Sequence, residues 1–177
     1  MFLILLFGLP HGSYILKGSL KVSVPTSDGS VYMLLVKGNA PFEMGSVSTA
    51  VIDGPRRVGE KYVGSIILPG TGDTVSVLLR GKGRVEITTA EDSTPWLGAV
   101  VGEDTVLRDL DTSGVVWVSV IGGRDVSVRA HSPSGDTVAV GEGSVVFRPK
   151  EPGRYSYVLG SRDERRVVVA TFVFRPN

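Results

Sequence analysis

The chain has no cysteine and no glutamine, and its only asparagines are Asn39 and Asn177. Without cysteine it can form no disulfide, no thiolate nucleophile and no metal centre with sulfur ligands. Asparagine, glutamine and cysteine are the thermolabile residues that proteins of hyperthermophiles tend to lose. The composition therefore predicts a heat-stable protein from a hyperthermophilic archaeon.

The chain also lacks an excess of charge of either sign, with 19 basic and 18 acidic residues. This balance argues against a nucleic-acid partner, because nucleic-acid-binding domains carry a basic surface. The two histidines, His11 and His131, lie in turn-like segments with no other ligands beside them. No G-x-S-x-G or phosphate-loop motif occurs. We therefore expect no enzyme activity, no catalytic residue and no cofactor.

The longest apolar run at the N-terminus, Met1–Leu9, is too short to span a bilayer as a helix, which takes about 20 residues. It lacks the positive flank of a signal peptide. Three interpretations remain open: the remnant of a signal peptide, an apolar strand that pairs within the fold or with a neighbour, and a membrane-associating end. We treat residues 1–13 as a separate N-terminal segment, and Met1–Leu9 as the only expected membrane contact.

Helical periodicity is almost absent, and a single helical turn within Glu103–Asp111 is the one exception that we expect. Residues 14–24 instead alternate strictly, with Leu16, Leu20, Val22 and Val24 on one side. This period of two is typical of a half-buried strand. Further strands are predicted at 31–36, 47–52, 62–68, 74–79, 84–88, 99–101, 115–120, 125–129, 137–140, 145–147, 155–159 and 166–174.

Turn signals recur every eight to twelve residues, as in all-β sandwiches. The polar stretch Ala90–Pro95 is the best boundary between two halves of similar size. We therefore expect an all-β fold of two tandem antiparallel β-sandwich domains, at residues 14–93 and 94–177. The alternative is one larger jelly-roll-like sandwich.

The last third of the chain contains the segments SVVFRPKEPGRYSYVLGS and RRVVVATFVF. An apolar strand, a Pro-Gly corner, alternating tyrosines and a long final strand resemble the closing strands of immunoglobulin-like or cupredoxin-like Greek-key sandwiches, over residues 95–177. The immunoglobulin-like resemblance implies that Tyr155 hydrogen-bonds to nearby backbone, and that Trp117 is a core aromatic on a central strand. If the fold is cupredoxin-like, the copper site of that family is absent, because the site needs a cysteine and two histidines and the chain has no cysteine.

The segment DLDTSG places Asp109 and Asp111 two residues apart before a glycine, like the first half of a calcium loop. The glutamate that should close such a loop is replaced by Val120. The two aspartates are therefore weak candidates for a calcium site, and a solvated acidic loop is the alternative.

These observations favour a non-enzymatic structural or assembly protein of the cell surface or exterior. Such a protein could be a filament subunit that joins its neighbour by N-terminal strand addition. The donated strand would be either Met1–Leu9 or residues 14–24, with Leu16, Leu20, Val22 and Val24 as partner-binding residues. The alternative is that residues 14–24 form the first strand of their own sheet. Other readings are a binding or accessory module of an envelope or membrane complex and a jelly-roll capsid-type protein.

Overall fold

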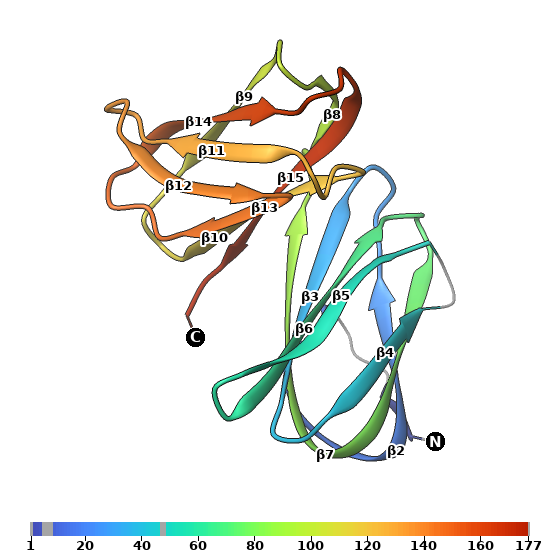
Figure 1. The fold of residues 1–177 in the computed structure, drawn as a ribbon. Coiled ribbons are helices and arrows are strands. Elements are labelled where there is room, and N and C mark those ends of the chain that lie inside the picture. Colours follow the sequence, from blue (N-terminus) through green and yellow to red (C-terminus); the bar gives the residue numbers. More distant parts are fainter. Residues whose placement is uncertain (1, 5–8, 47–48, 177) are drawn as a thin grey trace. The chain divides into compact units, whose positions relative to one another are not determined.

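The computed structural model describes residues 2–4, 9–46 and 49–176. These residues form strands, turns and bends and contain no helix, so no helix that could cross a membrane occurs among them either. The strands build three sheets, antiparallel apart from one short parallel pair (Figure 1). The predicted all-β, sandwich-like fold is confirmed. Contacts along the chain divide it into two compact units, Met1–Ser93 and Thr94–Asn177.

The first unit is one seven-stranded sheet with the order β1-β2-β7-β3-β6-β5, and β4 also pairs with β7. Its strands are β1 (Phe2–Ile4), β2 (Gly12–Pro25), β3 (Val31–Gly38), β4 (Phe42–Ser46), β5 (Val51–Val58), β6 (Lys61–Pro69) and β7 (Thr74–Asp92). β7 is the central strand: it pairs with β2 along most of its length, with β4 near its start and with β3 near its end. The sheet therefore bends around a single core, which β2, β3, β4, β6 and β7 supply.

β7 corrects the prediction of separate strands at 74–79 and 84–88. Gly81 and Gly83, which lie between these two predicted strands, have φ values of +148° and +100°, which residues other than glycine rarely adopt. Gly81 lies opposite Gly18 of β2, where φ is +103°. The glycines therefore bend the two paired strands together rather than ending them.

Two further strands of the first unit differ from the prediction. β4 was missed, because it is short and ends at the glycine and serine of Gly45–Ser46. The strand expected at 47–52 is β5, at 51–58, which continues through Gly54–Pro55 with a register shift between Asp53 and Arg56. A proline is tolerated there because β5 is an edge strand and the residue needs no N–H for the sheet. Residues 47 and 48 of the prediction lie outside the described residues.

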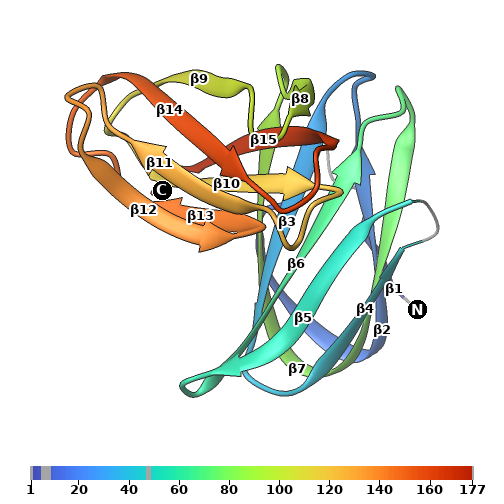
Figure 2. The ribbon, with the colours of Figure 1, turned by 45° about the horizontal axis from the view of Figure 1, so that its top comes forward.

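The second unit consists of two four-stranded sheets, β13-β10-β15-β8 and β12-β11-β14-β9 (Figure 2). Its strands are β8 (Trp96–Val100), β9 (Thr105–Leu110), β10 (Val115–Ile121), β11 (Ser127–His131), β12 (Thr137–Glu142), β13 (Ser144–Phe147), β14 (Gly153–Gly160) and β15 (Arg166–Phe174). The antiparallel pairs are nested: β11 with β12, β10 with β13, β9 with β14 and β8 with β15.

The helical turn expected within Glu103–Asp111 is wrong, because this segment contains β9. Val106 and Leu110 are buried, and the residues on either side of each are exposed. Their spacing of four fits one face of a helix or of a strand. Pairing of β9 with β14 decides for the strand.

Trp117 does lie on a central strand, β10, but the prediction that it is a core residue is wrong. Its neighbours Val116 and Val118 are buried in the core, so alternation along the strand turns the indole to the opposite face, where it is half-buried. The core aromatics are Phe147, Tyr155 and Tyr157. The hydroxyl of Tyr155 donates a hydrogen bond of 2.7 Å to the carbonyl oxygen of Glu151, as predicted.

Candidate functional site at the edge of β2

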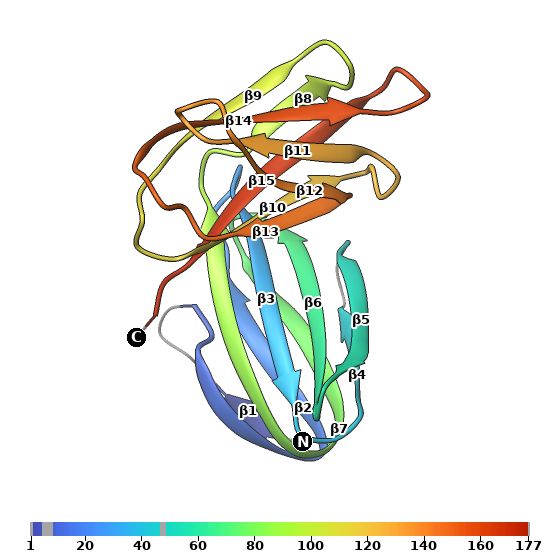
Figure 3. The same cartoon turned by 60° about the vertical axis from the view of Figure 1, so that its left-hand side comes forward.

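The clearest candidate for function is the sheet edge where β1 adds to β2 (Figure 3). β1 pairs in parallel with the second half of β2, with Phe2 opposite Leu20 and Ile4 opposite Val22. Among the described residues no strand covers this edge of β2 at residues 12–19. Ile15, in that uncovered stretch, is 61% exposed. An uncovered edge presents unpaired N–H and C=O groups, which can bind another strand.

The side chains of the four residues predicted to bind a partner point into the core and not towards this edge. Leu16, Leu20, Val22 and Val24 are at most 3% exposed and lie in the core of the first unit. β2 pairs with β7 of the same chain from Gly12 to Pro25. Residues 14–24 therefore belong to the chain's own sheet, which was the alternative arrangement. A partner-binding role for these four side chains stays a prediction, and it would require β2 to leave its sheet.

The chain length between β1 and β2 is short for a parallel pair. Only residues 5–11 connect Ile4, beside Val22, with Gly12, ten residues earlier on β2. In a straight strand, the ten residues from Gly12 to Val22 would measure about 33 Å. The eight residue-to-residue steps from Ile4 to Gly12 reach about 26–29 Å when fully extended. Parallel neighbours usually need a connection of a dozen or more residues. The bend at Gly18 shortens this distance.

A pocket of about 250 Å³ lies on the same sheet, between β4 and β7. Met44, Gly45 and Leu78 contribute its apolar lining, and Glu43 and Arg80 contribute charges. Successive Cα partners connect it with the edge: Lys21 of β2 is opposite Leu78, and Leu78 is opposite Gly45. A Cβ at Gly45 would meet no atom within 4 Å, so the glycine leaves the pocket open.

Tyr14, on the first half of β2, is half-buried and packs against the core of the first unit. Burial raises the pKa of its phenol above the ordinary value. The hydroxyl donates a long hydrogen bond of 3.5 Å to the carbonyl oxygen of His11. Tyr14 therefore remains neutral at physiological pH and helps to fix the start of β2.

The calcium candidates Asp109 and Asp111 each lie beside an arginine. Asp109 Oδ1 is 3.5 Å from Arg154 Nε, and Asp111 Oδ2 is 3.7 Å from Arg175 Nη2. The Ser113 hydroxyl, then its backbone N–H and Arg175, lower the pKa of Asp111. The part of the chain that the structure describes contains no group of three or more histidines and carboxylates that could hold a metal. The two aspartates are thus not joined by further ligands there.

His11 belongs to the first unit and His131 to the second. His131 lies on β11, where Nδ1 is 3.4 Å from the Thr137 hydroxyl. His11 is exposed just before β2.

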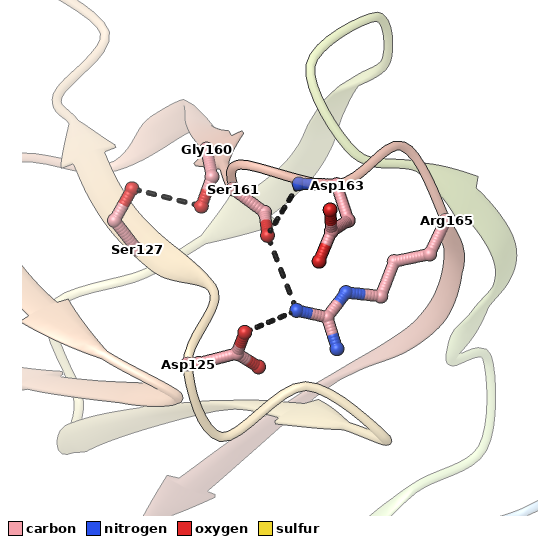
Figure 4. A network of polar contacts seen from close by, with 6 residues as sticks. All are labelled: Asp125, Ser127, Gly160, Ser161, Asp163 and Arg165. Atoms are coloured by element: carbon pink, nitrogen blue, oxygen red, sulfur yellow. Dashed lines mark hydrogen bonds and ion pairs between the residues drawn. The ribbon is translucent and has the colours of Figure 1, made fainter.

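A polar network closes one end of the second unit, between the loop after β10 and the loop after β14 (Figure 4). The Arg165 guanidinium donates to Asp125 and, at 3.1 Å, to the Ser161 hydroxyl. The bond from Arg165 is the main cause that lowers the pKa of Asp125. Ser127 donates to the carbonyl oxygen of Gly160 at 3.1 Å. These contacts hold the loop after β10 against the loop after β14, so we assign them a role in stability.

The outward face of the sheet β12-β11-β14-β9 carries four exposed aliphatic side chains. Their exposed fractions are 63% for Val140, 45% for Val158, 43% for Leu107 and 40% for Val138. Arg129 lies between Val140 and Val158 as the Cα partner of both. Sequence reasoning missed this face, because the four residues come from three strands whose order is set by long-range pairing.

A comparison with protein-family models and with curated proteins finds no match to this chain.

Proposed function

We propose that the protein is a non-enzymatic structural or assembly protein whose copies associate by strand addition. In the assembly, β1 of one copy pairs with the β2 edge of the next, at residues 20–22. Main-chain hydrogen bonds supply the affinity in this mode of recognition. A position at the surface of a hyperthermophilic archaeal cell belongs to the same proposal and rests on composition.

The observation that carries the proposal is the parallel pairing of β1 with an edge strand through a short connection. Within one chain, seven residues separate the last residue of β1 from the first residue of β2. Between two chains the same pairing places no demand on this connection. Exchange of an identical element between copies is a common route to oligomers, and it would remove the constraint that a short connection places on the parallel pair.

The sandwich type of residues 94–177 is part of the proposal. Nested pairing of eight strands in two sheets is the path of a jelly roll, a long hairpin folded over itself. An immunoglobulin-like constant domain instead has seven strands divided four and three. The hydrogen bond of Tyr155 fits the immunoglobulin-like resemblance, but the strand order favours the jelly roll. Jelly rolls occur in capsid proteins, which is compatible with assembly.

Cysteine trapping tests the strand exchange, because the chain has no thiol of its own. Leu3 and Lys21 are Cα partners, and neighbouring strands are about 4.8 Å apart, within the Cα range of a disulfide. A tagged L3C chain and a differently tagged K21C chain are refolded together and then oxidised. We expect a disulfide-linked heterodimer. In the double variant L3C/K21C we expect disulfide-linked chains of increasing length.

The control pairs L3C with V58C, since Val58 is 62% exposed on β5 at a different edge of the sheet. Its cross-linking measures random collision. A double variant that forms only intramolecular disulfides at every protein concentration would refute the exchange. So would equal yields from the Lys21 and Val58 pairs.

A binding or accessory module is the second candidate, and the outward face with Val140, Val158 and Leu107 favours it. Exposed apolar side chains gathered on one face of a sheet often mark a protein-binding surface. This candidate predicts a monomer in size-exclusion chromatography across all concentrations, together with no heterodimer in the trapping experiment.

A further inference from the structure

A second pocket of the first unit, of about 90 Å³, is lined largely by cations. Its charged residues are Lys37 of β3, Lys61 of β6, and Arg84 and Glu86 of β7. All four are exposed at the outward face of the bent sheet. Ser13, Gly38 and Asn39 complete the lining.

The pocket has a defined framework of backbone bonds. The backbone N–H of Arg84 donates to Asn39 Oδ1 at 2.8 Å, and the backbone N–H of Asn39 donates to the carbonyl oxygen of Arg84 at 3.1 Å. Gly83, with φ of +100°, makes room for this contact, since a Cβ there would lie 2.5 Å from Asn39 Oδ1. Because the Oδ1 atom of Asn39 accepts this bond, its Nδ2 group remains as a hydrogen-bond donor.

Donors outnumber acceptors in the lining. Two ammonium groups, a guanidinium, a hydroxyl and an amide nitrogen can donate, whereas Glu86 contributes the one carboxylate. Glu86 lies opposite Lys37 in the register. Within the described residues no carboxylate is within ion-pair distance of Lys37, Lys61 or Arg84. The lining therefore carries two more positive charges than negative ones.

We propose that this pocket binds a phosphate-type oxyanion. Near neutral pH a phosphate group carries one or two negative charges and most of its oxygens are acceptors, which matches the excess of donors and of positive charge. A guanidinium can bind two of its oxygens at once, and ammonium groups act as point charges. Either a free phosphate compound or the headgroup of an anionic lipid can supply this group. The site is independent of the strand exchange.

Two arms of one experiment test the site and distinguish the sources. The first is calorimetric titration with inorganic phosphate at constant ionic strength. The second is cosedimentation with phosphatidylglycerol vesicles, with phosphatidylcholine vesicles as the reference. Both use the intact chain and the double variant K37Q/K61Q. We expect saturable binding that this variant weakens by about tenfold or more, since a lost charge-assisted contact has this effect.

The matched control is K17Q/K82Q, which removes the same charge from the same unit. Lys17 and Lys82 are exposed and directly opposite each other on β2 and β7, and neither lines the pocket. We expect this variant to weaken binding less than about twofold. Binding of free phosphate identifies a soluble compound, and binding confined to phosphatidylglycerol identifies a headgroup. Absence of binding in both arms, or equal losses in the two double variants, overturns the proposal.

Discussion

The hydrogen bond from Tyr155 to Glu151 yields the sharpest stability prediction, for the substitution Tyr155→Phe. Tyr155 is 1% exposed, and its hydroxyl is 2.7 Å from the carbonyl oxygen of Glu151. Phenylalanine keeps the ring, which stacks on Phe147 at a centroid distance of 5.7 Å. Only the hydrogen bond is lost, and a carbonyl oxygen is left without its partner. We expect a destabilisation of about 1–2 kcal/mol, and about 4–8 °C in melting temperature for each kcal/mol.

Tryptophan fluorescence is the assay, because Trp96 and Trp117 are the only tryptophans and both lie in the second unit. Guanidinium unfolding followed by this signal therefore reports on the unit that contains Tyr155. Tyr155→Ala provides the upper limit, since it also removes the stacked ring and costs about 3–5 kcal/mol. Tyr62→Phe, in the first unit, should leave the tryptophan-reported midpoint unchanged.

Two outcomes would contradict this reasoning. A midpoint for Tyr155→Phe equal to that of the wild type would mean that the bond contributes nothing beyond what water supplies. A loss as large as that of Tyr155→Ala would mean that the hydroxyl fixes the whole corner before β14, so that its removal also disrupts packing.

Two further predictions concern other places. The carboxyl of Asp125, whose pKa Arg165 lowers, stabilises the fold above its unfolded-state pKa of about 3.9, and this contribution disappears as the pH falls through the lower folded value. In R165Q the pKa of Asp125 should rise towards its ordinary value in a carboxyl NMR titration; an unchanged pKa would rule out Arg165 as the cause. Gly81→Ala should destabilise by about 1–3 kcal/mol in thermal unfolding, because φ is +148° and its Cβ would lie 3.0 Å from the carbonyl oxygen of Pro41. Gly45→Ala, in open space, should be nearly neutral, and equal effects would contradict the argument.

Strands with an uninterrupted pattern were predictable from the sequence. The alternation in residues 14–24 gave the right faces for Leu16, Leu20, Val22 and Val24 in β2. The prediction at 166–174 matches β15. Glycine and proline caused two of the errors, at Gly81 and Gly83 in β7 and at Pro55 in β5. These residues permit a turn locally, but pairing with neighbouring strands continued the strand through them.

The candidate sites were far less predictable. The composition suggested that Met1–Leu9 could form a strand, but nothing in it indicated pairing in parallel with residues 20–22. The pocket residues Lys37, Lys61 and Arg84 are isolated surface charges in the sequence, because they are brought together by pairing of β3 with both β6 and β7. Such contacts depend on long-range strand order, which local patterns do not contain.

The energetic cost of leaving the sheet differs between the two segments proposed as donors to a neighbouring copy. Removal of residues 14–24 from the sheet would expose Leu16, Leu20, Val22 and Val24, at about 1.5–3 kcal/mol each. The total, about 6–12 kcal/mol, is comparable with the whole stability of a domain. Release of β1 breaks the backbone pairing of residues 2–4 with residues 20–22, and β2 pairs separately with β7 from Gly12 to Pro25. These costs favour β1 over residues 14–24 as the proposed donor, so a substitution that weakens β2–β7 pairing should lower stability without promoting assembly.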